Sequence, residues 1–241
     1  MSLAIKVKNL TKEFYIDKDN PTSLNLLIKI ITLSFKSTKF MALDNISFEI
    51  NKGDRVGLIG DNGSGKTTLL RILSGLYSKT SGVIEASGKI ATLLNVDTGM
   101  EWKLSARENI YLFAMMLGIE KTKIEKNIKN IIKFAGIKEF INAPLGDFSR
   151  GMIERLAFTI FRYTDADILL IDEMLSSGDI HFKEESYNVL KEFIRRSRTM
   201  IITSHDMEVI RKFCNKTIIL KEGKIVAYGP TKIVVNKYYK F

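Results

Sequence analysis

Hydrophobic and polar positions alternate with a period of two in the first part of the chain. Ile5 and Val7 are separated by a lysine, and Ile46, Phe48 and Ile50 are separated by polar residues. Successive side chains of a strand point to opposite faces of a sheet. Both segments therefore predict strands with one buried face.

Shorter apolar runs predict further strands. Residues 55–59 form an apolar run that leads into a glycine-rich turn. Residues 83–84 and 90–94 are also apolar, and they flank Ser87 and Gly88. We interpret this second pair of runs as a β-hairpin.

The middle of the chain changes to the period of a helix. Ile124, Ile128, Ile131 and Ala135 recur on one helical face, with lysines on the other faces, and Gly136 follows as a C-terminal cap. The pattern predicts an amphipathic helix that ends at this glycine.

The last third alternates between strands and helices. Residues 168–171 and 200–202 are apolar strands with an amphipathic helix between them, and residues 218–227 predict a hairpin that turns at Glu222 and Gly223. This alternation indicates an α/β fold with a mainly parallel core sheet. No linker interrupts the chain, so we expect a single domain over 1–241 with an inserted helical subdomain at about 100–165.

Composition excludes several classes of protein. The 241 residues are 45% hydrophobic and 27% charged, which is ordinary for a globular chain with a core. The single cysteine, Cys214, excludes a disulfide framework. The longest apolar segment, 24–35, is shorter than the roughly 20 residues of a membrane span, and no signal-peptide pattern is present. We expect a cytoplasmic protein that is soluble or peripheral to a membrane.

The net charge of +10 favours an acidic partner. Nucleic acid, an anionic lipid surface and nucleotide phosphates all fit such a charge. The charge is also explained if the lysines only solvate the helix faces, so the net charge alone does not decide between these alternatives.

Residues 60–67 match the P-loop pattern G-x-x-x-x-G-K-[ST], with a predicted strand before it and a predicted helix after it. Its glycines allow backbone N–H groups to surround phosphate oxygens, and the N-terminus of the helix favours anions. Lys66 adds a cation at the β- and γ-phosphates, and the Thr67 hydroxyl can bind Mg²⁺. The motif predicts a nucleoside triphosphate site.

Two acidic residues and a histidine follow predicted strands of the same sheet. Asp172 and Glu173 end the apolar run 168–171, where Asp172 can hold Mg²⁺ and Glu173 can polarise the attacking water. His205 lies just after the strand at 200–203, at the edge where open α/β sheets bind ligands.

Together these motifs resemble the ABC ATPases, in the same order and over nearly the whole chain. The signature loop of that family resembles 148–152, where Ser149 and Gly151 keep the pattern and Arg150 departs from it. The run 148–158 is similar to the branch of the family that exports polysaccharides.

Other segments resemble the same branch. Residues 176–179 are similar to its D-loop, and 107–110 to the start of its helical subdomain. Phe14 occupies the place of the aromatic residue that stacks on adenine, with Tyr15 as the alternative. Asn95 lies nearest to the place of the usual Q-loop glutamine, with Asp97 close by.

The resemblance implies a P-loop NTPase fold of the ABC ATPase type, with an antiparallel β subdomain beside the parallel core sheet. The residues it implies are Phe14, Gly60, Asn62, Gly63, Ser64, Gly65, Lys66, Thr67, Thr68, Ser149 and Gly151 for the nucleotide, Thr67 and Asp172 for the metal, and Glu173, His205 and Lys66 for catalysis. It further implies ATP and Mg²⁺ as ligands and a homodimer with composite sites. The resemblance also implies separate permease subunits and a lipid-linked glycan as partners. It implies a peripheral location on the cytoplasmic face of the bacterial inner membrane.

An inserted segment at about 17–40 also resembles the export branch. Leu24, Leu27, Ile28 and Ile31 share one helical face. We expect an amphipathic helix beside the permease or the lipid headgroups, and the alternative is that it packs on its own domain.

Two other functions compete with export. The net charge suggests a soluble ABC-type ATPase that acts on nucleic acid or ribosomes, but such proteins typically carry two cassettes or a long coiled coil, so we expect no nucleic acid partner. A non-catalytic nucleotide-binding module is the second alternative, and the presence of Lys66, Asp172, Glu173 and His205 argues against it.

Overall fold

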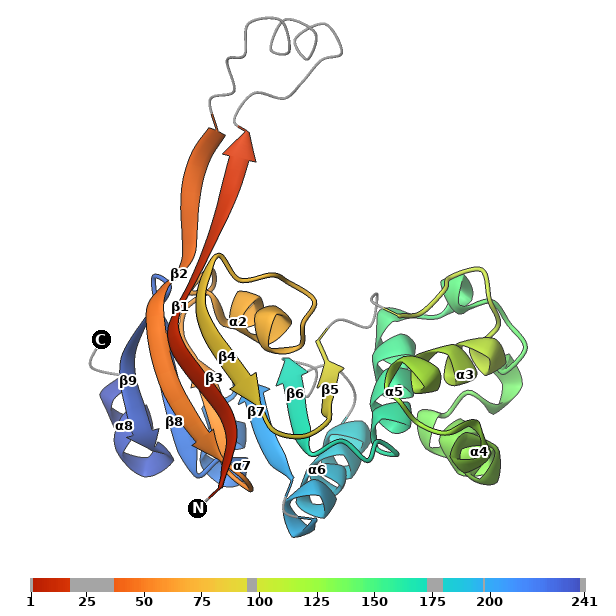
Figure 1. Ribbon diagram of the computed structural model, residues 1–241. Coiled ribbons are helices and arrows are strands. Elements are labelled where there is room, and N and C mark those ends of the chain that lie inside the picture. The colour runs from red at the N-terminus through yellow and green to blue at the C-terminus, as the bar shows by residue number, and fades with distance from the viewer. Residues whose placement is uncertain (1, 18–36, 95–98, 173–179, 197, 239–241) are drawn as a thin grey trace, which may run out of the picture.

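The computed structural model describes residues 2–17, 37–94, 99–172, 180–196 and 198–238, and its strands form two sheets (Figure 1). The larger sheet has the order β5-β6-β7-β3-β8-β9. Its strands are β3 (Arg55–Ile59), β5 (Ile90–Leu93), β6 (Ile168–Asp172), β7 (Thr199–Thr203), β8 (Lys216–Lys221) and β9 (Lys224–Pro230). All neighbours are parallel except β8 and β9, which confirms the predicted α/β fold with a mainly parallel core.

Core side chains cover both faces of this sheet. Along β6, Ile168 and Leu170 belong to one buried cluster, whereas Leu169 and Ile171 belong to the other. The first cluster includes α2 (Lys66–Leu73) and the smaller sheet, and the second includes α6 (Ile180–Arg195) and α7 (Met207–Phe213). Burial on both faces explains why the parallel strands are continuous apolar runs.

The smaller sheet is antiparallel, with the order β2-β1-β4. It contains β1 (Leu3–Asp17), β2 (Ser37–Asn51) and β4 (Ser81–Ala86). β1 and β2 pair over their whole length. Beyond the contacts of Glu13 with Thr80 and of Phe14 with Tyr77, their paired ends, 15–17 with 37–39, extend as a two-stranded arm (Figure 1).

The predicted hairpin at 83–94 is wrong, because its two strands belong to different sheets. β4 pairs with β1, whereas β5 pairs in parallel with β6. The turn between them is bound to the start of β6: the Lys89 N–H donates to Asp167 Oδ2 at 2.9 Å, and the Asp167 N–H donates to the Lys89 carbonyl at 2.9 Å. These bonds direct the chain away from β4 and into the larger sheet.

The helices α3 (Ala106–Met116), α4 (Lys121–Ala135) and α5 (Arg150–Phe161) stand together beside β5 and β6 (Figure 1). Short 3₁₀ turns at Lys138–Phe140 and Leu145–Asp147 connect α4 to α5. α4 ends as predicted at Gly136, whose φ of 70° provides the left-handed cap. α3 begins with a capping box in which hydrogen bonds from Ser105 hold the pKa of Glu108 below its ordinary value.

The ends of the segment 17–40 are strands rather than helix, because β1 continues to Asp17 and β2 begins at Ser37. The apolar positions predicted to form an amphipathic helix lie within 18–36, outside the described residues. Among the residues that are described, the helices are too short or too polar to cross a membrane.

Candidate nucleotide-binding site

The P-loop connects β3 to α2 at the carboxyl end of the parallel strands. β3 lies between β7 and β8, so the loop emerges from the middle of the larger sheet. Ligands of open α/β sheets bind at this edge, where loops from several strands converge.

Two glycines of the loop lie where no side chain fits. Gly60 has a φ of 151°, and a Cβ there would stand 2.1 Å from the carbonyl oxygen of Leu220 in β8. Gly65 has a φ of 107°, and its Cβ would stand 2.6 Å from the carbonyl oxygen of Ala42 in β2. The loop is therefore packed directly against the backbone of two other strands.

The start of α2 is suited to an anion. Gly65 occupies the N-cap in a left-handed conformation and offers no side chain to cap the first turn, so the N–H groups of 66–68 have no acceptor within the helix. The buried Ser64 hydroxyl has no hydrogen-bond partner among the described residues. Uncapped N–H groups and an unsatisfied hydroxyl together fit phosphate oxygens.

Lys66 is buried, and its ammonium group is held by the loop itself. Nζ donates to the carbonyl oxygens of Gly60 at 2.7 Å and Asp61 at 3.0 Å. A buried cation thus stands beside the uncapped helix start, which increases the attraction for a phosphate group.

Asp172 joins the P-loop to β6 and β7. The Thr67 hydroxyl donates to Asp172 Oδ2 at 3.1 Å, and the Thr203 hydroxyl donates to Oδ1 of the same carboxylate. The carboxylate is buried. An alcohol oxygen beside a carboxylate is a ligand set that suits the hard cation Mg²⁺.

The other predicted catalytic residues are His205 and Glu173, which come shortly after Thr203 and Asp172 in the sequence. His205 is exposed and follows the buried Ser204, the first residue after β7. The next residue, the half-buried Asp206, caps α7 by accepting from the Glu208 N–H. Glu173 follows Asp172 but lies outside the described residues, as do the predicted D-loop and Asn95.

The remaining P-loop residues are more accessible. Asn62 and Gly63 are exposed, and Thr68 is half-buried in the first turn of α2. Among the described residues, nothing lies within 4 Å of the position that a Cβ would take at Gly63, and its φ of 79° is the feature that favours glycine there.

Phe14 is half-buried in β1 and contacts a residue that the sequence did not single out. Its ring packs against Tyr77 in a T-shaped pair with centroids 5.9 Å apart. Tyr15, the alternative for the adenine contact, is 69% exposed.

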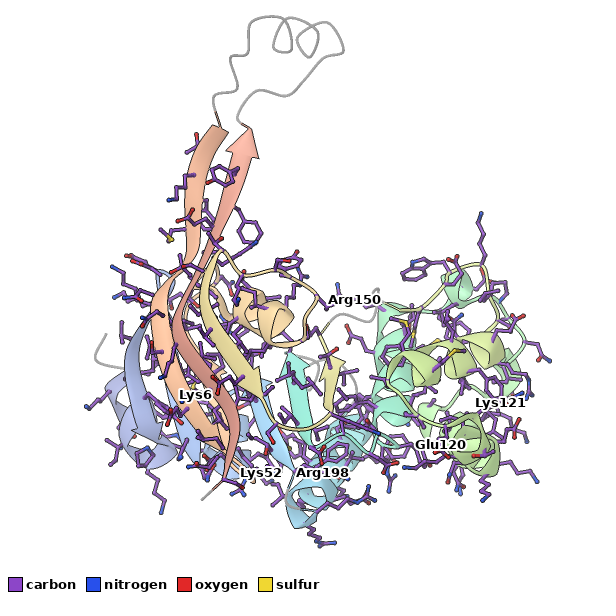
Figure 2. The ribbon with its side chains drawn as sticks, viewed as in Figure 1. Lys6, Lys52, Glu120, Lys121, Arg150 and Arg198 are labelled. Carbon is purple, nitrogen blue, oxygen red and sulfur yellow. The ribbon has the colours of Figure 1, made fainter. Side chains whose placement is uncertain are left out.

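The signature residues are not beside the P-loop of the same chain. The Ser149 hydroxyl caps α5 by accepting from the Met152 N–H at 3.3 Å, and a Cβ added at Gly151 would meet no described residue within 4 Å. Arg150 pairs with Glu154 at 2.9 Å and lies at the upper end of α5 (Figure 2). α5 stands across β5 and β6 from α2 (Figure 1).

Two distant segments support the P-loop in a way that local patterns could not predict. The Gly223 N–H, in the turn between β8 and β9, donates to the Ser64 carbonyl at 3.0 Å. The Tyr238 hydroxyl, at the end of α8 (Thr231–Tyr238), donates to Asp61 Oδ1 at 3.3 Å. Both contacts arise from parts of the chain that follow the P-loop by more than 150 residues.

Comparisons with known proteins agree on one family. Residues 43–176 match the family model described as "ABC transporter". The teichoic acids export ATP-binding protein TagH of Lactococcus lactis is 39% identical over 98% of this chain, which spans about half (51%) of that protein. The O-antigen export system ATP-binding protein RfbB of Klebsiella pneumoniae is 32% identical over 99% of this chain and 98% of its own length.

Solved structures show the same fold. The chain is similar to a dimeric ATP-binding cassette, MJ0796, bound to ADP and Pi, with a TM-score of 0.75 and 22% sequence identity over 94% of this chain and 98% of that one. At this sequence identity the similarity supports the fold alone, and the function is argued from the site and from the relatives.

Proposed function

The chain belongs to the ABC transporter family, and from this premise we propose that it is the ATP-hydrolysing subunit of a bacterial exporter. Its substrate would be a lipid-linked polysaccharide of the O-antigen, capsule or teichoic acid type, moved across the cytoplasmic membrane. The names of the relatives, a teichoic acids export protein and an O-antigen export protein, support this class of cargo.

The cluster of Lys66, Thr67 and Asp172 carries the proposal. It places a buried cation, an uncapped helix start and a Mg²⁺-compatible oxygen pair at one end of one loop. The phosphates of ATP would bind to the loop N–H groups and Lys66, and Mg²⁺ would bind to Thr67 and Asp172. The metal, when bound, supplies positive charge that stabilises the transferred phosphoryl group.

Glu173 and His205 would complete the hydrolytic site. A carboxylate directly after Asp172 can take the proton of the attacking water, which is general base catalysis. His205 would orient groups at the same sheet edge, since it follows β7, which hydrogen-bonds to β6. The retention of these acid–base residues favours an enzyme over a module that only binds nucleotide.

A homodimer would supply the signature residues. Ser149 caps α5 and Gly151 lies in its first turn, and α5 stands away from α2, the helix that follows the P-loop of the same chain (Figure 1). The N-terminus of α5 can face an anion. In a head-to-tail dimer each signature loop would close the nucleotide site of the partner. The dimeric cassette with the same fold supports this arrangement.

Transport also requires a membrane-spanning partner. We propose separate permease subunits, with this chain peripheral on the cytoplasmic face of the inner membrane. The inserted segment 17–40, whose first and last residues belong to β1 and β2, would lie next to the permease or the lipid headgroups. A Leu27→Glu variant that keeps ATP hydrolysis but stops glycan export would support this placement, and an unfolded subunit would contradict it.

Phosphate release from the purified chain tests the enzymatic function. Lys66→Ala should abolish Mg²⁺-dependent release, because the site loses its buried cation, whereas Lys126→Ala, on the exposed side of α4, should leave release unchanged. Unaltered turnover in Lys66→Ala would refute the site. Copurification with a membrane protein rather than with nucleic acid would separate export from the alternative of a soluble ATPase.

A further inference from the structure

Four side chains form a stack beside α2, the helix that follows the P-loop, which we call the base-side stack: Lys12, Phe14, Tyr77 and Arg71. Lys12 and Phe14 lie on β1, Arg71 lies in the last turn of α2, and Tyr77 follows that helix. The Lys12 Nζ lies 4.7 Å from the centroid of the Phe14 ring, and Phe14 in turn meets Tyr77. The stack therefore connects β1 to α2.

Arg71 holds Tyr77 by three contacts. The Arg71 Nη1 donates to the Tyr77 hydroxyl at 2.8 Å, and the guanidinium carbon lies 5.2 Å from the centroid of the tyrosine ring. The Tyr77 N–H also donates to the Arg71 carbonyl at 3.0 Å. Both the backbone and the ring of Tyr77 are thus fixed relative to α2.

Tyr77 in turn restricts Phe14. The two rings meet at an interplanar angle of 74°, the edge-to-face arrangement that aromatic pairs favour. Both residues are only half-buried, so general core packing restricts the phenylalanine ring less than it would at a fully buried position. The contact with Tyr77, together with Lys12 over the ring, therefore restricts the plane of Phe14.

We propose that Tyr77 is a positioning residue for nucleobase recognition: it orients Phe14, the ring on which the family resemblance leads us to expect the adenine to stack, and fixes that ring to α2. The same helix begins at Lys66, so the stack couples the base end of the nucleotide site to its phosphate end. This inference rests on the proposed function and adds a residue that acts through Phe14 rather than on the nucleotide itself.

A positioning role and a packing role differ in what they change. If Tyr77 only packs, its loss would lower the stability of the protein and weaken the binding of every ligand to the same extent. Loss of positioning would weaken only ligands that carry a base, because the phosphate contacts of the P-loop do not involve Phe14. ADP and inorganic pyrophosphate separate the two roles, since both bind phosphate sites and only ADP has a base.

Titration calorimetry of the full chain with these two ligands is the experiment. Tyr77→Ala should weaken ADP binding about threefold to tenfold and leave pyrophosphate binding unchanged. Tyr77→Phe, which keeps the ring, should recover most of the affinity for ADP. Phe14→Ala should weaken ADP binding about tenfold, and adding Tyr77→Ala to it should cause no further loss.

A matched control exists on the other side of the larger sheet. Tyr187 in α6 packs against Phe213 with centroids 5.1 Å apart, and Lys212 lies 4.9 Å from the tyrosine centroid. Tyr187→Ala removes a comparable stack far from the P-loop and should change neither affinity. If Tyr77→Ala does not fold, Arg71→Lys keeps the charge but loses the planar guanidinium, and should weaken ADP binding about twofold with pyrophosphate unchanged.

Three results would overturn the inference. They are an unchanged affinity for ADP in Tyr77→Ala, an equal loss for ADP and pyrophosphate, or additive losses in the double variant with Phe14→Ala. A wild-type chain that binds neither ligand would instead refute the proposed nucleotide site, and the inference with it.

Discussion

Gly60 and Gly63 provide a stringent test of the P-loop geometry, because the same substitution should have different effects at the two positions. Both glycines have a positive φ, 151° and 79°. A methyl group at Gly60 would stand 2.1 Å from the Leu220 carbonyl oxygen and 2.8 Å from the Ser64 hydroxyl, whereas at Gly63 it would meet no described residue within 4 Å.

The expected magnitudes follow from these surroundings. Gly63→Ala carries a left-handed strain of about 1–2 kcal/mol, partly offset by about 0.4–1 kcal/mol from a less flexible unfolded chain. We expect a net destabilisation of about 1 kcal/mol. Gly60→Ala adds a collision with the backbone of β8, which no rotamer change relieves, so we expect a loss of about 3 kcal/mol or more.

Urea denaturation of the ligand-free protein measures both values from the shift in midpoint at constant slope. Without nucleotide, the comparison reports the packing and backbone strain of the loop and is independent of phosphate binding. A second measurement, ADP affinity, should show Gly60→Ala as the more impaired variant, because the loop must move away from β8. Equal destabilisation of the two variants would refute the packing of the loop against Leu220.

Three further predictions concern the site and its stability. Glu173→Gln should retain ATP binding but release phosphate about 10²–10⁴-fold more slowly, because the amide cannot accept a proton, and normal release would show that the base is elsewhere. Mixing Lys66→Ala with Gly151→Asp subunits, each inactive alone, should restore partial ATPase activity if the site is composite, and a mixture that stays inactive at every ratio would contradict it. Burial opposes the charge of Asp54, but hydrogen bonds from Lys216, Asn215 and the backbone hold the pKa of Asp54 below its ordinary value. The ionised Asp54 therefore stabilises the folded state at pH values above the unfolded-state pKa, and this contribution is lost as the pH falls through the lowered folded-state pKa. The free energy of unfolding, measured against pH in the acid range, should accordingly fall less steeply in Asp54→Asn than in the wild type.

Local patterns in the sequence determined much of the fold and the identity of the candidate site. The P-loop is continuous in the chain from β3 to α2, so its spacing could be recognised without knowledge of distant contacts. The buried strands β6 and β7 were visible as apolar runs, because a parallel sheet covered on both faces needs no polar positions. The helix that ends at Gly136 and the hairpin that turns at Glu222 and Gly223 were also predictable, because each is signalled by residues next to one another in the chain.

Only the tertiary structure decided which distant segments meet. Strand order places β7 beside β6, and this brings the Thr203 hydroxyl to Asp172. The pairing of β8 with β3 places the Leu220 carbonyl against Gly60. Tertiary packing also brings Tyr77 to Phe14, although more than 60 residues of chain separate them. The hairpin predicted at 83–94 was wrong for the corresponding reason: an apolar run predicts that a strand forms, but its partner is chosen by hydrogen bonds and core contacts with residues far away in the sequence, such as Asp167.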